Sequence, residues 1–309
     1  MDLVVFDQSE LTAVARALRE VAQSNDVFSE TEADLIVAVG ALHGILIDPN
    51  ALAPISPEEL ATAVTGAHQR KRALQLLVVM ALAEGEPRAH AETALERFAE
   101  ALAVDLRDLE ILREVADEHG LMVRIDMVRR LSGTLLRDQK LATLKSMATA
   151  AILGEDRALA EKYRTLASYP EGTLGRTLFD FWKENGFGIP GERGSLPERG
   201  IFHDVGHLLS GYGVDPAGEI RQGAFQAGFV RTDGFAFLLF AILQFHVGVR
   251  ITPVAKGERG YFNPKDVLRA AQRGASCAVD LSDPEQWDFW KVADVPITEL
   301  RTRYGIAPL

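Results

Sequence analysis

Two histidines four residues apart mark the stretch of this chain that is best suited to metal chemistry. His203 and His207 lie within residues 200–219, which read GIFHDVGHLLSGYGVDPAGE. On a helix this spacing places both imidazoles on one face, one turn apart, where they can bind the same ion. Asp204 follows the first histidine directly, and eleven residues separate His207 from Glu219. Two nitrogens and one or two carboxylates therefore indicate a metal site.

The segment between His207 and Glu219 must reverse direction for this site to form. A straight helix would carry Glu219 roughly 18 Å along its axis from His207. The residues between them include Gly211, Gly213 and Pro216, which are strong helix breakers. We therefore expect a helix, a tight turn and a second segment that folds back onto the first. The alternative is a pair of histidines with ordinary hydrogen bonds and two solvated acids.

Asp204 has two alternative roles in such a site. Neighbouring residues on a helix point about 100° apart, so Asp204 either coordinates the ion from the side or hydrogen-bonds a ligand histidine. A set of ligands with an open position indicates a catalytic metal, whereas a closed tetrahedral set of four indicates a structural one. The sequence leaves these alternatives open.

The H-D-x-x-H motif, followed by eleven residues and a glutamate, resembles the signature of the ubiquinone-biosynthesis Coq4-like family. Two further segments resemble that family in the same order along the chain. Residues 169–176, YPEGTLGR, are similar to its Pro-x-Gly-Thr-x-Gly segment, and residues 297–308, ITELRTRYGIAP, are similar to its closing segment. The resemblance covers residues from about 165 to 309, which is about half of the chain.

This resemblance implies that His203, Asp204, His207 and Glu219 all bind a divalent metal, with zinc favoured over iron. It also implies a role in ubiquinone biosynthesis, with a prenylated aromatic quinone precursor or another lipid as the ligand. The family's roles include oxidative removal of the ring carboxylate at C1 and the organisation of other quinone-biosynthesis proteins at the membrane. We expect a metal-dependent enzyme or, as the alternative, a non-enzymatic lipid-binding scaffold with a structural metal.

Two other residues are candidates for binding the substrate. Arg199 lies four residues before His203, so on a helix it shares that face and is placed to pair with a substrate carboxylate; a surface salt bridge is the alternative. His246, in the apolar run 235–249, is expected to line the ligand pocket or to be a satisfied core histidine. A third class, the His-Asp phosphohydrolases, is disfavoured because those enzymes need more histidines and acids on separate helices.

The composition of the chain limits its partners and its compartment. The 309 residues carry a formal net charge of −11, which argues against nucleic-acid binding because phosphate contacts need a basic face. The single cysteine, Cys277, lies in an apolar context and is expected in the core of a protein from a reducing compartment. The first residues show neither a secretory signal nor a transit peptide. We expect a cytoplasmic protein, with contact to the inner face of the membrane as a peripheral protein.

Residues 1–140 predict a helical bundle that forms the first domain. Capping-box patterns occur at 29–32 (SETE) and 56–59 (SPEE), and the almost wholly apolar run 75–83 predicts a buried helix. This half resembles the tellurite-resistance TerB-like helical fold in its helix lengths and in the stretch ALAEGE at 81–86. We expect it to dock a partner or to self-associate as a homodimer.

Residues 141–309 predict a second, mostly helical domain that carries the metal motif. An amphipathic helix is expected over 173–184, and the all-round apolar run 235–249 predicts a core helix placed to wall a tunnel for a polyprenyl tail. The unbroken apolar part of that run is too short to span a bilayer. The fold class is therefore all-α. Further helix starts are expected at Ser195, Asn263, Ser282 and Thr298.

Overall fold

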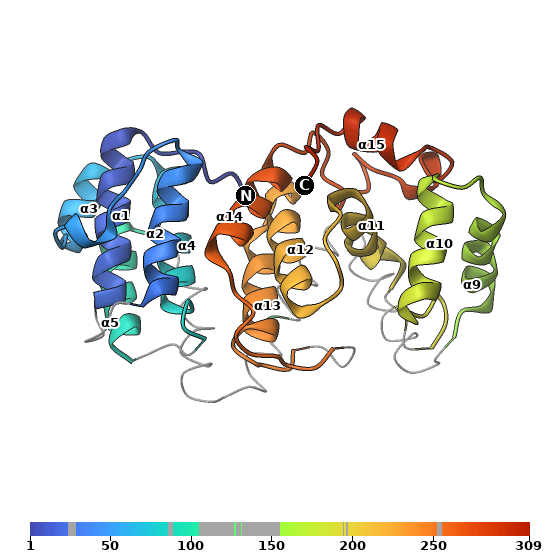
Figure 1. The fold of residues 1–309 in the computed structure, drawn as a ribbon, viewed down its shortest axis with the longest axis horizontal. Coiled ribbons are helices and arrows are strands. Elements are labelled where there is room, and N and C mark those ends of the chain that lie inside the picture. Colours follow the sequence, from blue (N-terminus) through green and yellow to red (C-terminus); the bar gives the residue numbers. More distant parts are fainter. Residues whose placement is uncertain are drawn as a thin grey trace.

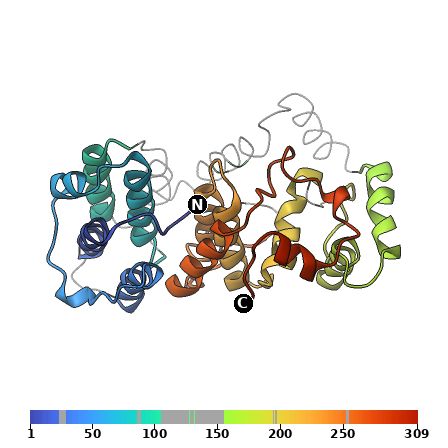
Figure 2. The same cartoon turned by 90° about the horizontal axis from the view of Figure 1, so that it is seen from above.

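The computed structural model describes residues 1–23, 29–85, 89–104, 127, 131, 155–193, 195, 197–251 and 255–309. Within these ranges it contains twelve α-helices and no β-strand, which confirms the all-α prediction. Figures 1 and 2 show α1–α5 at one end of the molecule, α12–α14 in the middle, and α9 and α10 at the other end. The predicted domain boundary at residues 140 and 141 lies outside the described residues.

The N-terminal bundle contains five helices, two of which begin at the predicted capping boxes. Ser29 and Ser56 each accept a hydrogen bond from the backbone of a glutamate three residues on, whose side chain accepts one from the serine backbone. All residues from 73 to 81 of α4 are buried, as the apolar run predicted. The helices are α1 (Gln8–Gln23), α2 (Glu30–Leu42), α3 (Pro57–Ala63), α4 (Ala67–Ala81) and α5 (Ala89–Leu102).

The C-terminal half contains seven described helices. Thr173, Asp215 and Asn263 begin three of them, each accepting a hydrogen bond from the backbone amide three residues on. The start predicted at Ser195 is not used, because α11 begins later, at Ile201. The helices are α9 (Arg157–Arg164), α10 (Leu174–Asn185), α11 (Ile201–Ser210), α12 (Pro216–Phe229), α13 (Phe235–Phe245), α14 (Pro264–Ala275) and α15 (Ile297–Arg303).

The helix predicted from Ser282 is replaced by turns. The Asp280 side chain accepts a hydrogen bond from the Ser282 backbone amide, and the Asp283 side chain accepts one from Glu285, both at 2.9 Å. Such turns compete with the bonds of an α-helix for the same backbone groups. Only a short 3₁₀-helix, Phe289–Lys291, follows.

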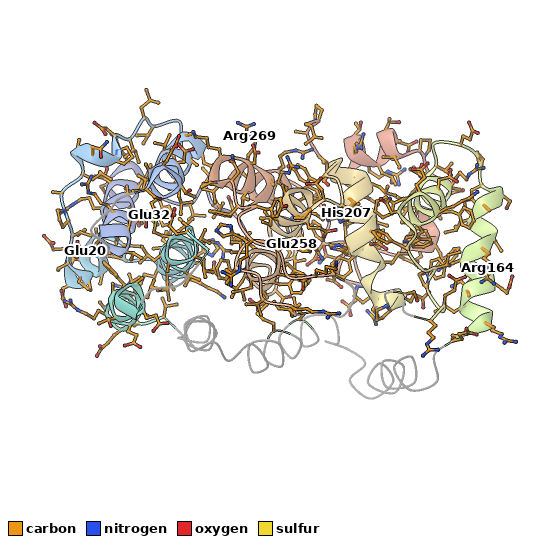
Figure 3. All side chains as sticks on the ribbon, turned by 60° about the horizontal axis from the view of Figure 1, so that its bottom comes forward. Glu20, Glu32, Arg164, His207, Glu258 and Arg269 are labelled. Carbon is orange, nitrogen blue, oxygen red and sulfur yellow. The ribbon has the colours of Figure 1, made fainter. Side chains whose placement is uncertain are left out.

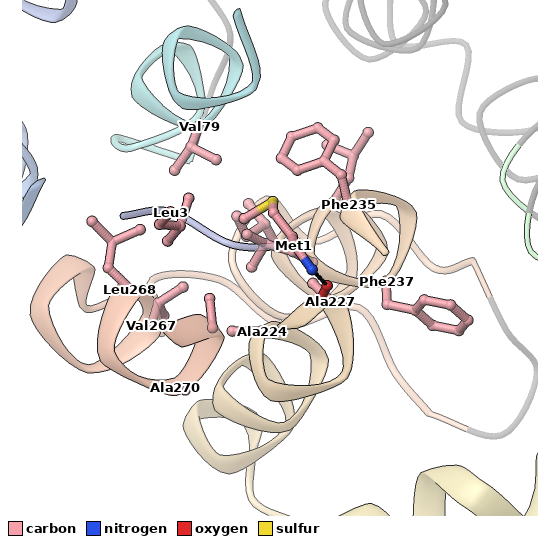
Figure 4. Packing of buried hydrophobic residues seen from close by; sticks show 14 of the residues in the cluster. Met1, Leu3, Val79, Ala224, Ala227, Phe235, Phe237, Val267, Leu268 and Ala270 are labelled. Atoms are coloured by element: carbon pink, nitrogen blue, oxygen red, sulfur yellow. Dashed lines mark hydrogen bonds between the residues drawn. The ribbon is translucent and has the colours of Figure 1, made fainter. Parts of the chain in front are cut away.

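One apolar core runs through both halves of the molecule. Figure 4 shows Leu3 between Val79 of α4 and Leu268 of α14, with Met1 beside Ala227 of α12. The Met1 amino group donates a hydrogen bond to the Ala227 carbonyl. The first residues of the chain therefore pack between the N-terminal bundle and the central helices.

The apolar helix α13 lies in this core, as predicted. Ten of its eleven residues are buried, and only Phe240 is partly exposed. The helix ends at Phe245, four residues before the predicted end. None of the helices in the described ranges is both long enough and apolar enough to cross a membrane. Figure 4 shows Phe237 pointing away from the Met1 side of this helix, toward the cavity considered below.

Candidate metal centre

The chain reverses direction between α11 and α12, as the helix breakers predicted. α11 ends at Gly211, whose φ of 81° lies in the left-handed region that favours glycine. Asp215 then caps α12, and Pro216 occupies its first position. Gly218 is needed because an added Cβ would lie 2.1 Å from a backbone carbonyl oxygen of the turn. Glu219 therefore falls in the first turn of α12, within reach of α11.

This reversal brings two imidazoles and one carboxylate together. The Nε2 atoms of His203 and His207 lie 3.2 Å apart, and the nearest Glu219 oxygens lie 3.5 and 3.6 Å from them. In the described part of the chain, these are the histidine, cysteine or acidic ligand atoms that converge, all within 4.8 Å of one another. Ligands about 2.0–2.1 Å from a tetrahedral zinc lie about 3.3 Å from each other. The three side chains thus have the spacing of three corners of a zinc site.

The opposite ring nitrogens fix how each histidine is turned. His203 Nδ1 lies 3.0 Å from Gln226 Oε1, and His207 Nδ1 lies 3.0 Å from the Tyr212 carbonyl oxygen. Both partners are acceptors, so each Nδ1 carries the proton and donates it. When a second group holds Nδ1–H in this way, Nε2 is the atom that is available to a metal. Figure 3 shows the labelled His207 in the interior, between the ends of the molecule marked by Glu20 and Arg164.

The charges of the cluster stabilise one another. Burial lowers the pKa of His203, but the hydrogen bond and charge of Glu219 outweigh it and raise that pKa to about 9. Burial raises the pKa of Glu219, but both histidines outweigh it and lower that pKa to about 2. Without a metal the carboxylate is therefore ionised and paired with an imidazolium, which indicates a site that favours a positive charge at its centre.

The structure does not bring Asp204 into this cluster. Its Oδ2 accepts a hydrogen bond of 2.7 Å from Trp182 Nε1, and it bonds neither histidine. Burial raises the pKa of Asp204. The predicted fourth ligand is thus directed to the side of α11, where a tryptophan of α10 holds it. Both sequence-based roles, ligand and partner of a ligand histidine, differ from the contact that is observed.

The cluster lies on the wall of an apolar cavity of about 540 Å³. That volume falls in the range of small-molecule sites. Phenyl rings of α13 form one wall, and the loop that follows α10 contributes another ring. The ligand atoms meet the cavity together with Asp204, Gln226 and Gln244. The aromatic residues that line the cavity are Phe187, Phe202, Phe237, Phe240 and Phe245.

The two predicted substrate-binding residues lie elsewhere. Arg199 is in the 3₁₀-helix Glu198–Gly200 and does not line the cavity. His246 faces the N-terminal bundle: its Nε2 lies 3.0 Å from the Ala83 carbonyl oxygen, and its Nδ1 accepts a hydrogen bond from the Phe262 amide. It is the satisfied core histidine of the two alternatives, and it joins the halves of the molecule.

Two glutamines of α12 were missed in the sequence. Gln222 donates to the His203 carbonyl oxygen at 3.3 Å and accepts a hydrogen bond from Ser210, which ties α12 to α11. Gln226 holds His203. They follow Glu219 by three and seven residues, so helical spacing places all three on one face. That spacing was the available signal.

Comparison with known proteins gives little that bears on function. Neither models of protein families nor curated proteins match this chain. Among solved structures, one from Nostoc punctiforme, described as a "putative ubiquinone biosynthesis protein", is similar with 17% identity and a TM-score of 0.34. The match covers 75% of this chain and 96% of that one. At this TM-score the match carries no weight for function.

Proposed function

We propose that this chain binds one divalent metal ion through Nε2 of His203, Nε2 of His207 and the carboxylate of Glu219. The single observation that carries the proposal is the convergence of these atoms, 3.2 to 3.6 Å apart, on the wall of an apolar cavity. Two imidazoles and one carboxylate suit zinc first and iron second. These three protein ligands leave a coordination position for an atom of a ligand in the cavity.

The ligand in this proposal is an amphiphile with a polar head at the metal and an apolar body along α13. A prenylated aromatic quinone precursor fits this description, and the sequence resemblance to the Coq4-like family points the same way. The role that we propose is therefore in quinone biosynthesis, together with other proteins of that process. A bound divalent metal would supply a Lewis acid that orients and polarises an oxygen of the head group.

This chain's own residues would divide the work of binding. His203 and His207 present fixed nitrogens, Glu219 supplies negative charge, and the phenyl rings of α13 exclude water from the ligand. Exclusion of water strengthens every charge interaction in the site. The His203 side chain is 28% exposed and that of His207 is 2% exposed, so the cluster is reached from the His203 side.

Elemental analysis of the purified chain, with mass spectrometry of co-purifying lipid, tests the proposal. We expect about one zinc or iron per chain and an apolar molecule with an oxygenated head. The variant His207→Ala should lose both the metal and this ligand, whereas the control His68→Ala, at an exposed histidine, should keep both. A wild-type chain that takes up neither zinc nor iron would overturn the proposal.

The same variant separates a catalytic metal from a structural one. If His207→Ala loses the metal but keeps its melting temperature, the metal serves the ligand and not the fold. If the domain unfolds, the metal braces the α11–α12 hairpin, and the alternative of a lipid-binding scaffold with a structural metal applies.

A further inference from the structure

Gln226 has a contact on only one end of its side chain. Its Oε1 accepts from His203 Nδ1 at 3.0 Å, but its amide nitrogen donates to no acceptor among the described residues. The residue is 2% exposed and lines the cavity. A buried N–H group without an acceptor costs about 1–3 kcal/mol, so such groups usually have a partner in the functional state.

Gln222, one turn away on α12, shows what a satisfied buried amide looks like in this protein. Both ends of its side chain are bonded within the protein, to the His203 carbonyl oxygen and to the Ser210 hydroxyl. Gln222 does not line the cavity, whereas Gln226 does. The free donor of Gln226 is therefore directed to the place where a ligand would bind.

We infer that Gln226 determines specificity: its carbonyl oxygen positions His203, and its amide N–H group binds an oxygen of the ligand beside the metal-bound atom. This inference rests on the proposed function. It narrows the ligand to an apolar molecule whose head carries two neighbouring oxygens, such as a carboxylate or an ortho-dioxygenated aromatic ring. One oxygen binds the metal, and the other accepts from Gln226. A head with a single metal-binding atom would leave the amide unpaired.

Two small probes on the cobalt-loaded protein test the donor role. Benzoate offers a second oxygen to the amide, whereas thiophenolate offers one sulfur to the metal and no second acceptor. We expect the ratio of their affinities, followed in the visible spectrum of cobalt, to fall about tenfold in both Gln226→Leu and Gln226→Glu. The ratio cancels the repulsion that Gln226→Glu exerts on either anion. An unchanged ratio in both variants would overturn the donor role.

The same variants separate the two roles of Gln226. Gln226→Glu keeps an acceptor for His203 and should keep the cobalt affinity, whereas Gln226→Leu should lose about 10–100-fold. Gln75→Leu, which removes another buried glutamine far from the cavity, is the control and should change neither value. Equal cobalt affinity in Gln226→Leu and the wild type would overturn the positioning role.

A metal-free measurement distinguishes failure of this inference from failure of the proposed function. In the apo protein, the His203 Nδ1–H proton should give a protected imidazole NMR signal, and Gln226→Leu should remove it by exchange with water. If the wild type binds no cobalt yet this signal depends on Gln226, the proposed function and the ligand contact fail while the contact with His203 stands. If the signal is unchanged in Gln226→Leu, that contact is refuted regardless of metal binding.

Discussion

The two histidine sites of the C-terminal half differ in what their ring nitrogens contact. His246 uses both nitrogens on backbone groups, the Ala83 carbonyl and the Phe262 amide. His203 and His207 use only Nδ1 in this way and turn Nε2 toward each other and toward Glu219. Burial alone therefore does not decide what a histidine does. The nitrogen that is left over decides it.

The same contrast appears in the pKa values. Burial lowers the pKa of His246, and its hydrogen bonds to the 82–83 backbone do not offset it. At His203, Glu219 more than offsets burial, and the pKa rises. One imidazole is thus held neutral as a link between the halves of the molecule. The other is held where a positive charge is stabilised, which is the property that a cation site requires.

Removing the carboxylate should break this contrast most strongly. In Glu219→Gln a neutral amide replaces the charged ligand at nearly constant volume, so we expect the zinc affinity to fall by at least about 100-fold. Competition with a chromophoric chelator measures it. His246→Ala is the matched variant at the other site and should bind zinc as the wild type does. Equal losses in the two variants would mean that the Glu219 cluster is not the zinc site.

Metal binding should also stabilise the fold through one of the two sites only. At a free zinc concentration 100 times Kd, a site that exists only in the folded state adds about 2.7 kcal/mol to the free energy of unfolding. We expect this gain, measured as a zinc-dependent rise in Tm, in the wild type and in His246→Ala. It should be absent in His203→Ala. A zinc-dependent rise of the same size in His203→Ala would contradict the assignment of the ligands.

Loss of His246 itself should weaken the junction between the halves. The substitution His246→Ala leaves the Ala83 carbonyl and the Phe262 amide without their partner in a buried place, which costs about 1–3 kcal/mol of unfolding free energy. Urea unfolding followed by circular dichroism measures the loss. The exposed variant His68→Ala should stay within about 0.5 kcal/mol of the wild type. No loss in His246→Ala would show that the junction does not depend on this histidine.

The local parts of the metal centre were predictable from the sequence. The spacing of His203 and His207 and the breakers before Glu219 act over one or two turns, so pattern alone gave the hairpin. The capping serines gave helix starts for the same reason. Arg199 failed because the rule that residues four apart share a face holds for an α-helix, and the chain there is a 3₁₀-helix.

Non-local contacts explain the rest. The contact of His246 with Ala83 joins residues 163 positions apart, and that of Asp204 with Trp182 joins two helices that no periodicity pairs. The acceptor for His207 is a backbone carbonyl, that of Tyr212, and a carbonyl leaves no mark in the sequence. Residue type and spacing therefore located the metal-binding nitrogens, whereas only the tertiary structure shows what turns them toward one point.

The smallest expected effect concerns the surface of the same junction. Lys265 of α14 lies 2.8 Å from Asp34 of α2, and the two side chains are 50% and 32% exposed. Solvent screens such a pair, so Lys265→Ala should cost less than about 1 kcal/mol of unfolding free energy, and less still in high salt. Urea unfolding at two salt concentrations measures it. If this loss exceeded that of His246→Ala, the exposed ion pair would hold the halves together instead of the buried imidazole.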